Sequence, residues 1–202
     1  MAEKKNEKNF KKMTAEDVKI LEEWLGKLMP ESFSDWERLP DIGLYMDQVL
    51  TMMDRQLAFY RRSDADKMLT QAMINNYTKD ELLPRAKDKK YNQSHLALLS
   101  ILCSLKPVLS ISDLKTLLHS LHNSECEKDV YSFFLETQSE TLEDVRKQTA
   151  AILESIRKTE SIQDFSDAEH EMALLALRLA VDARVRLLIT QKILDFFSEA
   201  ET

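Results

Sequence analysis

Amide and cationic side chains are concentrated between Gln71 and Lys90, and their chemistry is hydrogen bonding and charge rather than bond cleavage. Thr70 can cap a helix, and Met73, Ile74 and Tyr77 fall at helical spacing, so a helix is predicted over residues 70–79. Its other face would expose Gln71, Asn75, Asn76 and Lys79. Pro84 cannot continue the helix, and four cations follow: Arg85, Lys87, Lys89 and Lys90. Amides can contact base edges and cations can hold phosphates, so the pattern indicates a nucleic-acid-binding surface.

One spacing is compatible with a metal site. His119, His122 and Cys126 run i, i+3, i+7, which would place three ligands on one face of a continuous helix. Asn123-Ser124 resembles a helix end, however, and no fourth ligand is apparent. The favoured interpretation is that the two histidines interact with the dipole at the C-terminus of a helix. Two glycines leave no glycine-rich phosphate loop, and no nucleophile–base pair has a recognisable context. We expect no enzyme activity, no metal and no cofactor.

Composition predicts a helical protein. The 202 residues include two glycines and four prolines, so turn formers are scarce and an all-α fold of one domain or two small ones is expected. Cys103 and Cys126 form no disulfide framework, which favours a reducing compartment. Residues 1–12 lack the apolar run of a signal peptide, and charges interrupt the most apolar segment, residues 172–197. A cytoplasmic protein without a membrane span is expected.

The net charge of −7 is unevenly distributed. Residues 61–119 hold ten Lys/Arg and six Asp/Glu, whereas residues 1–60 hold nine and twelve, and residues 120–202 hold nine and seventeen. The basic third is therefore the one with the amide-bearing helix and the cationic loop, as expected of a DNA-binding module in an acidic protein. A chance fluctuation between windows is the alternative explanation.

Apolar periodicity predicts two helices before this region. Thr14 begins the first, which Pro30 closes. The second is expected over residues 40–60, with a broad apolar face that includes Ile42 and Tyr45.

Further helices are predicted after the cationic loop. A largely buried helix spans residues 95–105, and Ser110 or Ser112 caps the next. An acidic segment then forms one long helix, or two with a break near Ser139. Residues 167–197 are apolar around most of their helix, which must therefore be enclosed. Either this helix is the centre of a monomeric bundle or it belongs to a twofold dimer interface.

The segment from Leu39 to Leu118, about two fifths of the chain, carries a family resemblance. In order, Thr70, Ile74, Tyr77, Leu82-Leu83-Pro84, the basic loop and Tyr91 resemble the recognition helix and wing of MerR-type winged helix-turn-helix regulators. More closely, Leu39-Pro40-Asp41-Ile42, Met73-Ile74-Asn75-Asn76-Tyr77 and Lys89-Lys90-Tyr91 resemble an uncharacterised bacterial domain family of unknown function with MerR-like character. The resemblance implies binding to double-stranded DNA, transcriptional control and a homodimer formed by C-terminal helices.

The chain departs from the MerR pattern in three places. Asn75 and Asn76 stand where the family has arginine and an aromatic residue, although asparagine can still contact phosphate or adenine. Glu81 replaces a glycine, so the turn is expected to be built differently. Residues 61–67 lengthen the connection before Thr70, so the turn between the two helices of the motif is not the usual tight one.

These inferences define a flexible basic tail (1–13), an N-terminal helix with its connection (14–38), a MerR-like winged helix-turn-helix domain (39–122) and C-terminal dimerisation or sensing helices (123–202). We predict a regulator with a recognition helix at 70–79 and a basic wing at 85–91. Base edges would be contacted by Gln71, Asn75 and Asn76, and phosphates by Lys79, Arg85, Lys87, Lys89 and Lys90. The alternative is a helical interaction module whose winged helix no longer binds DNA. A small-molecule effector of the C-terminal helices is a further option without a named ligand.

Overall fold

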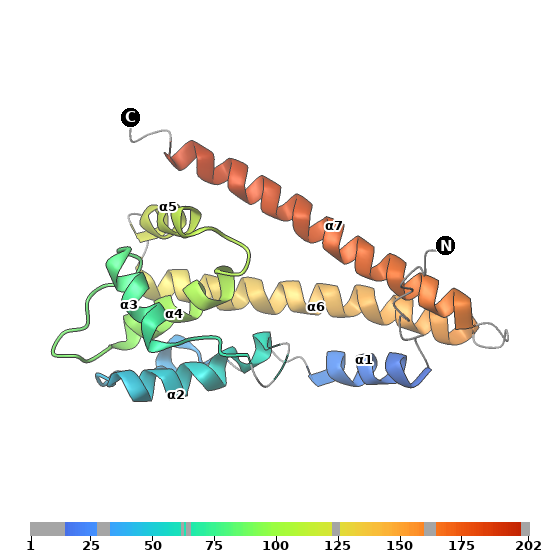
Figure 1. Cartoon of the computed structure of the whole chain (residues 1–202), viewed down its shortest axis with the longest axis horizontal. Coiled ribbons are helices and arrows are strands. Elements are labelled where there is room, and N and C mark those ends of the chain that lie inside the picture. The colour runs from blue at the N-terminus through green and yellow to red at the C-terminus, as the bar shows by residue number, and fades with distance from the viewer. Residues whose placement is uncertain are drawn as a thin grey trace, which may run out of the picture. The chain divides into compact units, whose positions relative to one another are not determined.

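The computed structural model describes residues 15–27, 33–61, 63, 66–122, 126–159 and 165–198, and these are mostly helical (Figure 1). The α-helices of these ranges are α1 (Ala15–Lys27), α2 (Met46–Gln56), α3 (Gln71–Lys79), α4 (Gln93–Leu105), α5 (Ile111–His122), α6 (Glu127–Thr159) and α7 (Phe165–Ser198). Short 3-10 helices lie at Trp36–Arg38 and Leu57–Tyr60. Strand-like pairing in the described chain is limited to two isolated bridges, Leu44 with Tyr91 and Lys87 with Lys90. The all-α prediction is confirmed.

The chain forms two compact units. One consists of α1 with residues 144–182, where Val18 and Leu153 are buried and Leu21 and Met172 pack against them. The other contains residues 33–143 and 183–198 and holds the larger core. Within the described ranges, none of the helices is both long and apolar enough to cross a bilayer.

Helix α4 is the centre of the larger core. It has no aspartate, glutamate, lysine or arginine, and eight of its thirteen residues are buried, including Leu96, Leu99 and Leu102. Asn92 caps its N-terminus by accepting a hydrogen bond from the His95 N–H at 3.1 Å. A helix buried on most sides must be covered by its neighbours, which here include α2, α3 and the start of α6.

Tyr131 ties the segment before α2 to the start of α6. Its side chain is fully buried, and its hydroxyl donates a hydrogen bond to the Ser34 carbonyl oxygen at 2.9 Å. The Tyr131 ring also meets Trp36 edge-on, with 6.2 Å between ring centroids. These contacts hold the 3-10 turn against the core although 97 residues separate Ser34 from Tyr131.

Helix α2 begins six residues later than its apolar pattern predicts. Leu44 is extended and paired with Tyr91, so the helix starts at Met46 with Tyr45 as its N-cap. The predicted helix start at Pro40 and the predicted burial of Ile42 and Tyr45 are therefore wrong, since these two side chains are 68% and 51% exposed. Periodicity alone could not reveal a pairing with a residue far along the chain.

Other predicted boundaries are resolved by the structure. Ser110 caps α5, because its hydroxyl accepts from the Asp113 N–H at 3.0 Å while its own N–H donates to the Asp113 carboxylate at 3.3 Å. Helix α6 continues through Ser139, so the alternative of two helices is wrong. Thr14 and Pro30 lie outside the described residues.

The C-terminal half of helix α7 has one buried and one exposed apolar face. Leu194 is buried, and Leu187 packs against the larger core. The opposite side of its C-terminal half keeps five large apolar side chains between 50% and 63% exposed: Val185, Leu188, Ile189, Ile193 and Phe196. Within a single chain α7 is therefore not enclosed in the way that a bundle centre would be.

Burial of a thiol in this core predicts alkaline destabilisation. Burial raises the pKa of Cys103 from its ordinary 9.0 to about 12, so the folded chain retains a proton that the unfolded chain loses. The contribution of this group to stability is complete below pH 9 and is lost progressively as the pH rises from 9 to about 12. The Cys103→Ala variant should lose ~1 kcal/mol at neutral pH by truncation, yet its free energy of unfolding should fall less steeply above pH 9.

Urea unfolding followed by circular dichroism over this pH range measures both effects. Cys126→Ala is the matched control, because it makes the same substitution at an exposed thiol outside the core. If the free energy of unfolding fell equally steeply above pH 9 in Cys103→Ala and in the unmodified chain, the raised pKa of Cys103 would be contradicted.

Candidate nucleic-acid interface

Helix α3 is held on one face and at its N-terminus. Thr70 accepts a hydrogen bond from the Met73 N–H at 3.3 Å, which confirms the predicted cap. Ile74 and Tyr77 are buried in the larger core, and Met73 packs against it. The residues predicted for the other face are all exposed: Gln71, Asn75, Asn76 and Lys79. Gln71, Asn75 and Lys79 are spaced by four residues, so they follow one line along the helix.

The C-terminus of α3 closes with a complete Schellman motif. The Leu82 N–H donates to the Tyr77 carbonyl at 2.8 Å, and the Glu81 N–H donates to the Thr78 carbonyl at 3.3 Å. Glu81 takes the left-handed conformation with φ 61°, the position that glycine usually fills. The expectation of a different turn at Glu81 is therefore wrong, since glutamate adopts the glycine geometry.

The Glu81 side chain also connects α3 to another helix. Its carboxylate lies 2.8 Å from the Lys115 ammonium on α5. The hydrogen bond from Lys115 lowers the pKa of Glu81. Both side chains are more than half exposed, so this pair orients the turn more than it stabilises the fold.

The predicted basic wing contains a two-residue hairpin, which we call the basic hairpin (residues 87–90). The Lys90 N–H donates to the Lys87 carbonyl at 2.9 Å, and Asp88 and Lys89 have φ values of 50° and 60°. Two successive positive φ values are the signature of a type I′ turn, which matches the twist of a hairpin. The link between α3 and α4 loops out beside these helices (Figure 1). All four of its predicted phosphate contacts are exposed: Arg85, Lys87, Lys89 and Lys90.

Two backbone hydrogen bonds anchor the base of the hairpin. Leu44 and Tyr91 exchange N–H to carbonyl bonds, both 2.8 Å long, and Tyr91 is buried. Gly43 allows the close approach, because a Cβ atom there would lie 2.8 Å from the Lys90 Cβ. The Lys90 ammonium lies 5.6 Å from the centre of the Tyr45 ring, within cation–π range.

The eight predicted contact residues thus fall on two exposed elements joined by a short, well-anchored link. Sequence reasoning missed Gly43, Leu44 and Lys115, which hold this link from other parts of the chain. Gly43 is one of only two glycines and was the available signal. Nothing in the sequence pairs Lys115 with Glu81.

The three residues considered for metal binding do not belong to one helix. Helix α5 ends at His122, and Cys126 lies just before α6, so the premise of one continuous helix is wrong. The Cys126 thiol donates instead to the Asp129 carboxylate at 2.8 Å. Within the described residues, no group of three or more histidine, cysteine or acidic side chains is arranged to hold a metal ion.

A family model described as Domain of unknown function (DUF1836) matches residues 34–141, more than half of the chain. The match includes α2, α3, the basic hairpin, α4 and α5. It confirms the resemblance to a domain family of unknown function, whereas the resemblance to MerR regulators stays a prediction. Neither the curated proteins nor the solved structures include a match.

The left-handed conformation at Glu81 leads to a prediction about stability. Glu81→Gly and Glu81→Ala both remove the ion pair with Lys115, but only glycine adopts φ 61° without steric strain. We expect Glu81→Gly to melt roughly 2–5 °C above Glu81→Ala in a thermal unfolding scan.

Asp80 provides the matched control, because it has φ −82° in the same turn. Here glycine gains nothing, so Asp80→Gly should melt below Asp80→Ala. If the alanine variant melted above the glycine variant at both positions, the Glu81 backbone would not be left-handed in solution.

Proposed function

We propose that this chain, which belongs to the DUF1836 family, is a cytoplasmic DNA-binding transcriptional regulator with a MerR-like winged helix-turn-helix. In this proposal α2 and α3 are the helices of the motif, and the basic hairpin is its wing. The observation that carries the proposal is an amide-bearing helix, capped and anchored, followed directly by a hairpin with exposed cations.

The exposed face of α3 suits the major groove. An α-helix fits that groove, and asparagine or glutamine can make two hydrogen bonds to adenine. Ile74 and Tyr77 fix the opposite face, so Gln71 and Asn75 are presented from a helix that does not have to form on binding. We assign Gln71, Asn75 and Asn76 to base edges and Lys79 to the backbone.

The basic hairpin suits the phosphate backbone. Its cations are exposed, and the Leu44–Tyr91 bridge fixes its base against the core. Lysine ammonium groups bind phosphate as point charges and release condensed counterions, which gives affinity without sequence preference. We assign this role to Lys87, Lys89 and Lys90 of the hairpin and to Arg85 just before it.

We further propose that two copies pair through α7. The exposed apolar residues of its C-terminal half form a stripe that water would otherwise cover, and such patches mark interaction sites. A twofold pairing would present two α3 helices to the two halves of a palindromic site.

The second candidate function is a helical interaction module. The same stripe on α7 would suit an amphipathic helix of another protein, and the net charge of −7 opposes DNA at long range. Failure to retain DNA at low salt by a folded protein would favour this function.

Removing charge from the basic hairpin tests the regulator. In the Lys87→Gln, Lys89→Gln, Lys90→Gln triple variant, affinity for host DNA fragments should fall, and the slope of log affinity against log salt should lose about 2–3 units. Fluorescence anisotropy over a salt series gives both values.

A triple variant of equal charge change serves as the control. Lys19→Gln, Lys27→Gln and Lys147→Gln alter exposed lysines of the other compact unit and should leave DNA affinity unchanged. Equal affinities for both triple variants, with folded circular dichroism spectra, would remove the wing assignment.

Polar substitution on α7 tests the pairing. The double variant Leu188→Ser, Phe196→Ser should be a monomer in light scattering, where the unmodified protein is a dimer. Each change replaces an exposed apolar side chain that the pairing would bury. Phe133→Ser, a change at a 67% exposed phenylalanine on α6, should leave the mass unchanged. A monomeric unmodified protein would exclude the pairing.

A further inference from the structure

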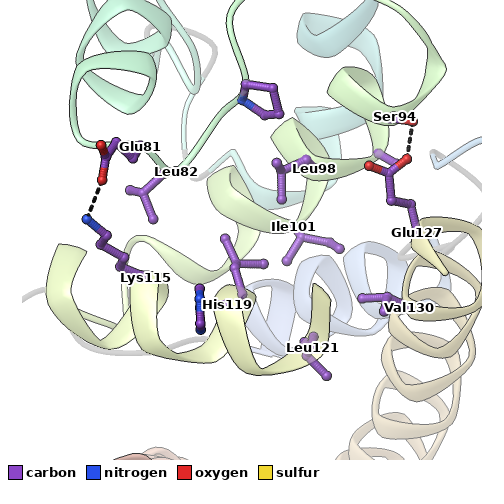
Figure 2. Close-up of a pocket in the computed structure, with 13 residues that line it drawn as sticks. Glu81, Leu82, Ser94, Leu98, Ile101, Lys115, His119, Leu121, Glu127 and Val130 are labelled. Carbon is purple, nitrogen blue, oxygen red and sulfur yellow. Dashed lines mark hydrogen bonds and ion pairs between the residues drawn. The ribbon is translucent and has the colours of Figure 1, made fainter. Parts of the chain in front are cut away.

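A pocket of about 330 Å³ lies beside the turn that follows α3 (Figure 2). It is partly open to solvent and is lined by that turn, α4, α5 and the first turn of α6, all within the larger compact unit. Its walls are largely aliphatic: Leu82, Ala97, Leu98, Ile101, Leu118 and Val130. Small-molecule sites are concave, mostly apolar and begin at about 300 Å³. The size and the lining of this pocket therefore suit a small ligand.

Two polar pairs lie on opposite sides of this pocket, with Leu98 and Ile101 between them (Figure 2). On one side the Lys115 ammonium is 2.8 Å from the Glu81 carboxylate. On the other side the Ser94 hydroxyl donates a hydrogen bond to the Glu127 carboxylate. The pairs join the α3 turn to α5 and α4 to α6, so they frame the apolar space from separate elements.

The two pairs differ in charge. Lys115 neutralises Glu81, whereas the hydroxyl of Ser94 leaves the negative charge of Glu127 in place. The pocket lining therefore includes two carboxylates, those of Glu81 and Glu127, and one lysine ammonium, that of Lys115. A carboxylate beside an apolar wall is a suitable partner for an amine, because a hydrogen bond between two charged groups is stronger than one between neutral groups.

We propose that this pocket binds a small amphipathic amine, whose apolar body lies among Leu98, Ile101 and Leu118 and whose ammonium group meets the Glu127 carboxylate. The inference concerns ligand binding alone and stands whether or not the chain binds DNA. It also differs from an effector site between the C-terminal helices, because none of the residues that line the pocket belongs to α7.

Three probes of matched shape test the proposal on the full chain: 3-phenylpropylamine, 3-phenylpropan-1-ol and 3-phenylpropanoate. In calorimetry the amine should bind with the highest affinity, about tenfold above that of the alcohol, and the carboxylate should bind with the lowest. Methyl NMR should show shifts at Leu98, Ile101, Leu118 and Val130 on addition of the amine.

Two variants and a control separate the contribution of the Glu127 charge from that of the apolar space. Glu127→Gln retains an acceptor for Ser94 but removes the charge, so the amine should bind no better than the alcohol. Leu98→Trp should fill the space and abolish binding of both. Glu136→Gln, an exposed change on the same helix, should alter neither affinity.

Absence of methyl shifts at millimolar amine would overturn the proposal. So would an affinity for the amine that Glu127→Gln leaves unchanged. Because Glu127 is exposed, this second result is accessible even if Leu98→Trp does not fold.

Discussion

The burial of α4 is the constraint on which the larger unit depends. A helix without Asp, Glu, Lys or Arg, and with Leu96, Leu99 and Leu102 fully buried, gains stability only when other elements cover it on several sides. The covering elements arrive from distant parts of the chain, and each brings apolar residues such as Met53 and Tyr131 to the same core. The outward faces of those elements are then fixed as a consequence.

The proposed DNA-binding surface is one such consequence. Helix α3 contributes Ile74 and Tyr77 to the core, so its amides must point to solvent. The link from α3 to α4 leaves the core through a Schellman turn and returns through the pairing of Leu44 with Tyr91. Between these two anchored points the chain reverses in a tight hairpin whose lysines are exposed.

Positive φ values without glycine characterise this link. Glu81, Asp88 and Lys89 adopt the left-handed conformation, which disfavours residues with a Cβ atom. Strained backbone persists where the surroundings determine it, and here the flanking Leu82 and Tyr91 are both buried. These positions carry charged side chains where glycine would have none: Glu81 pairs with Lys115 beside the pocket, and Lys89 extends the cationic surface. The strained positions therefore coincide with both proposed binding surfaces.

Local sequence signals determined the helices and much of the proposed interface. Caps at Thr70 and Ser110 and the apolar spacing around Ile74 predicted the element type and the exposed residues, because these signals act within a few residues. Only the tertiary structure decided the late start of α2, which depends on Leu44 pairing with Tyr91, and the exposure of one face of α7. It also decided the pocket, whose polar pairs join residues more than thirty positions apart. Contacts of that range follow from the packing of whole elements, and no local pattern encodes them.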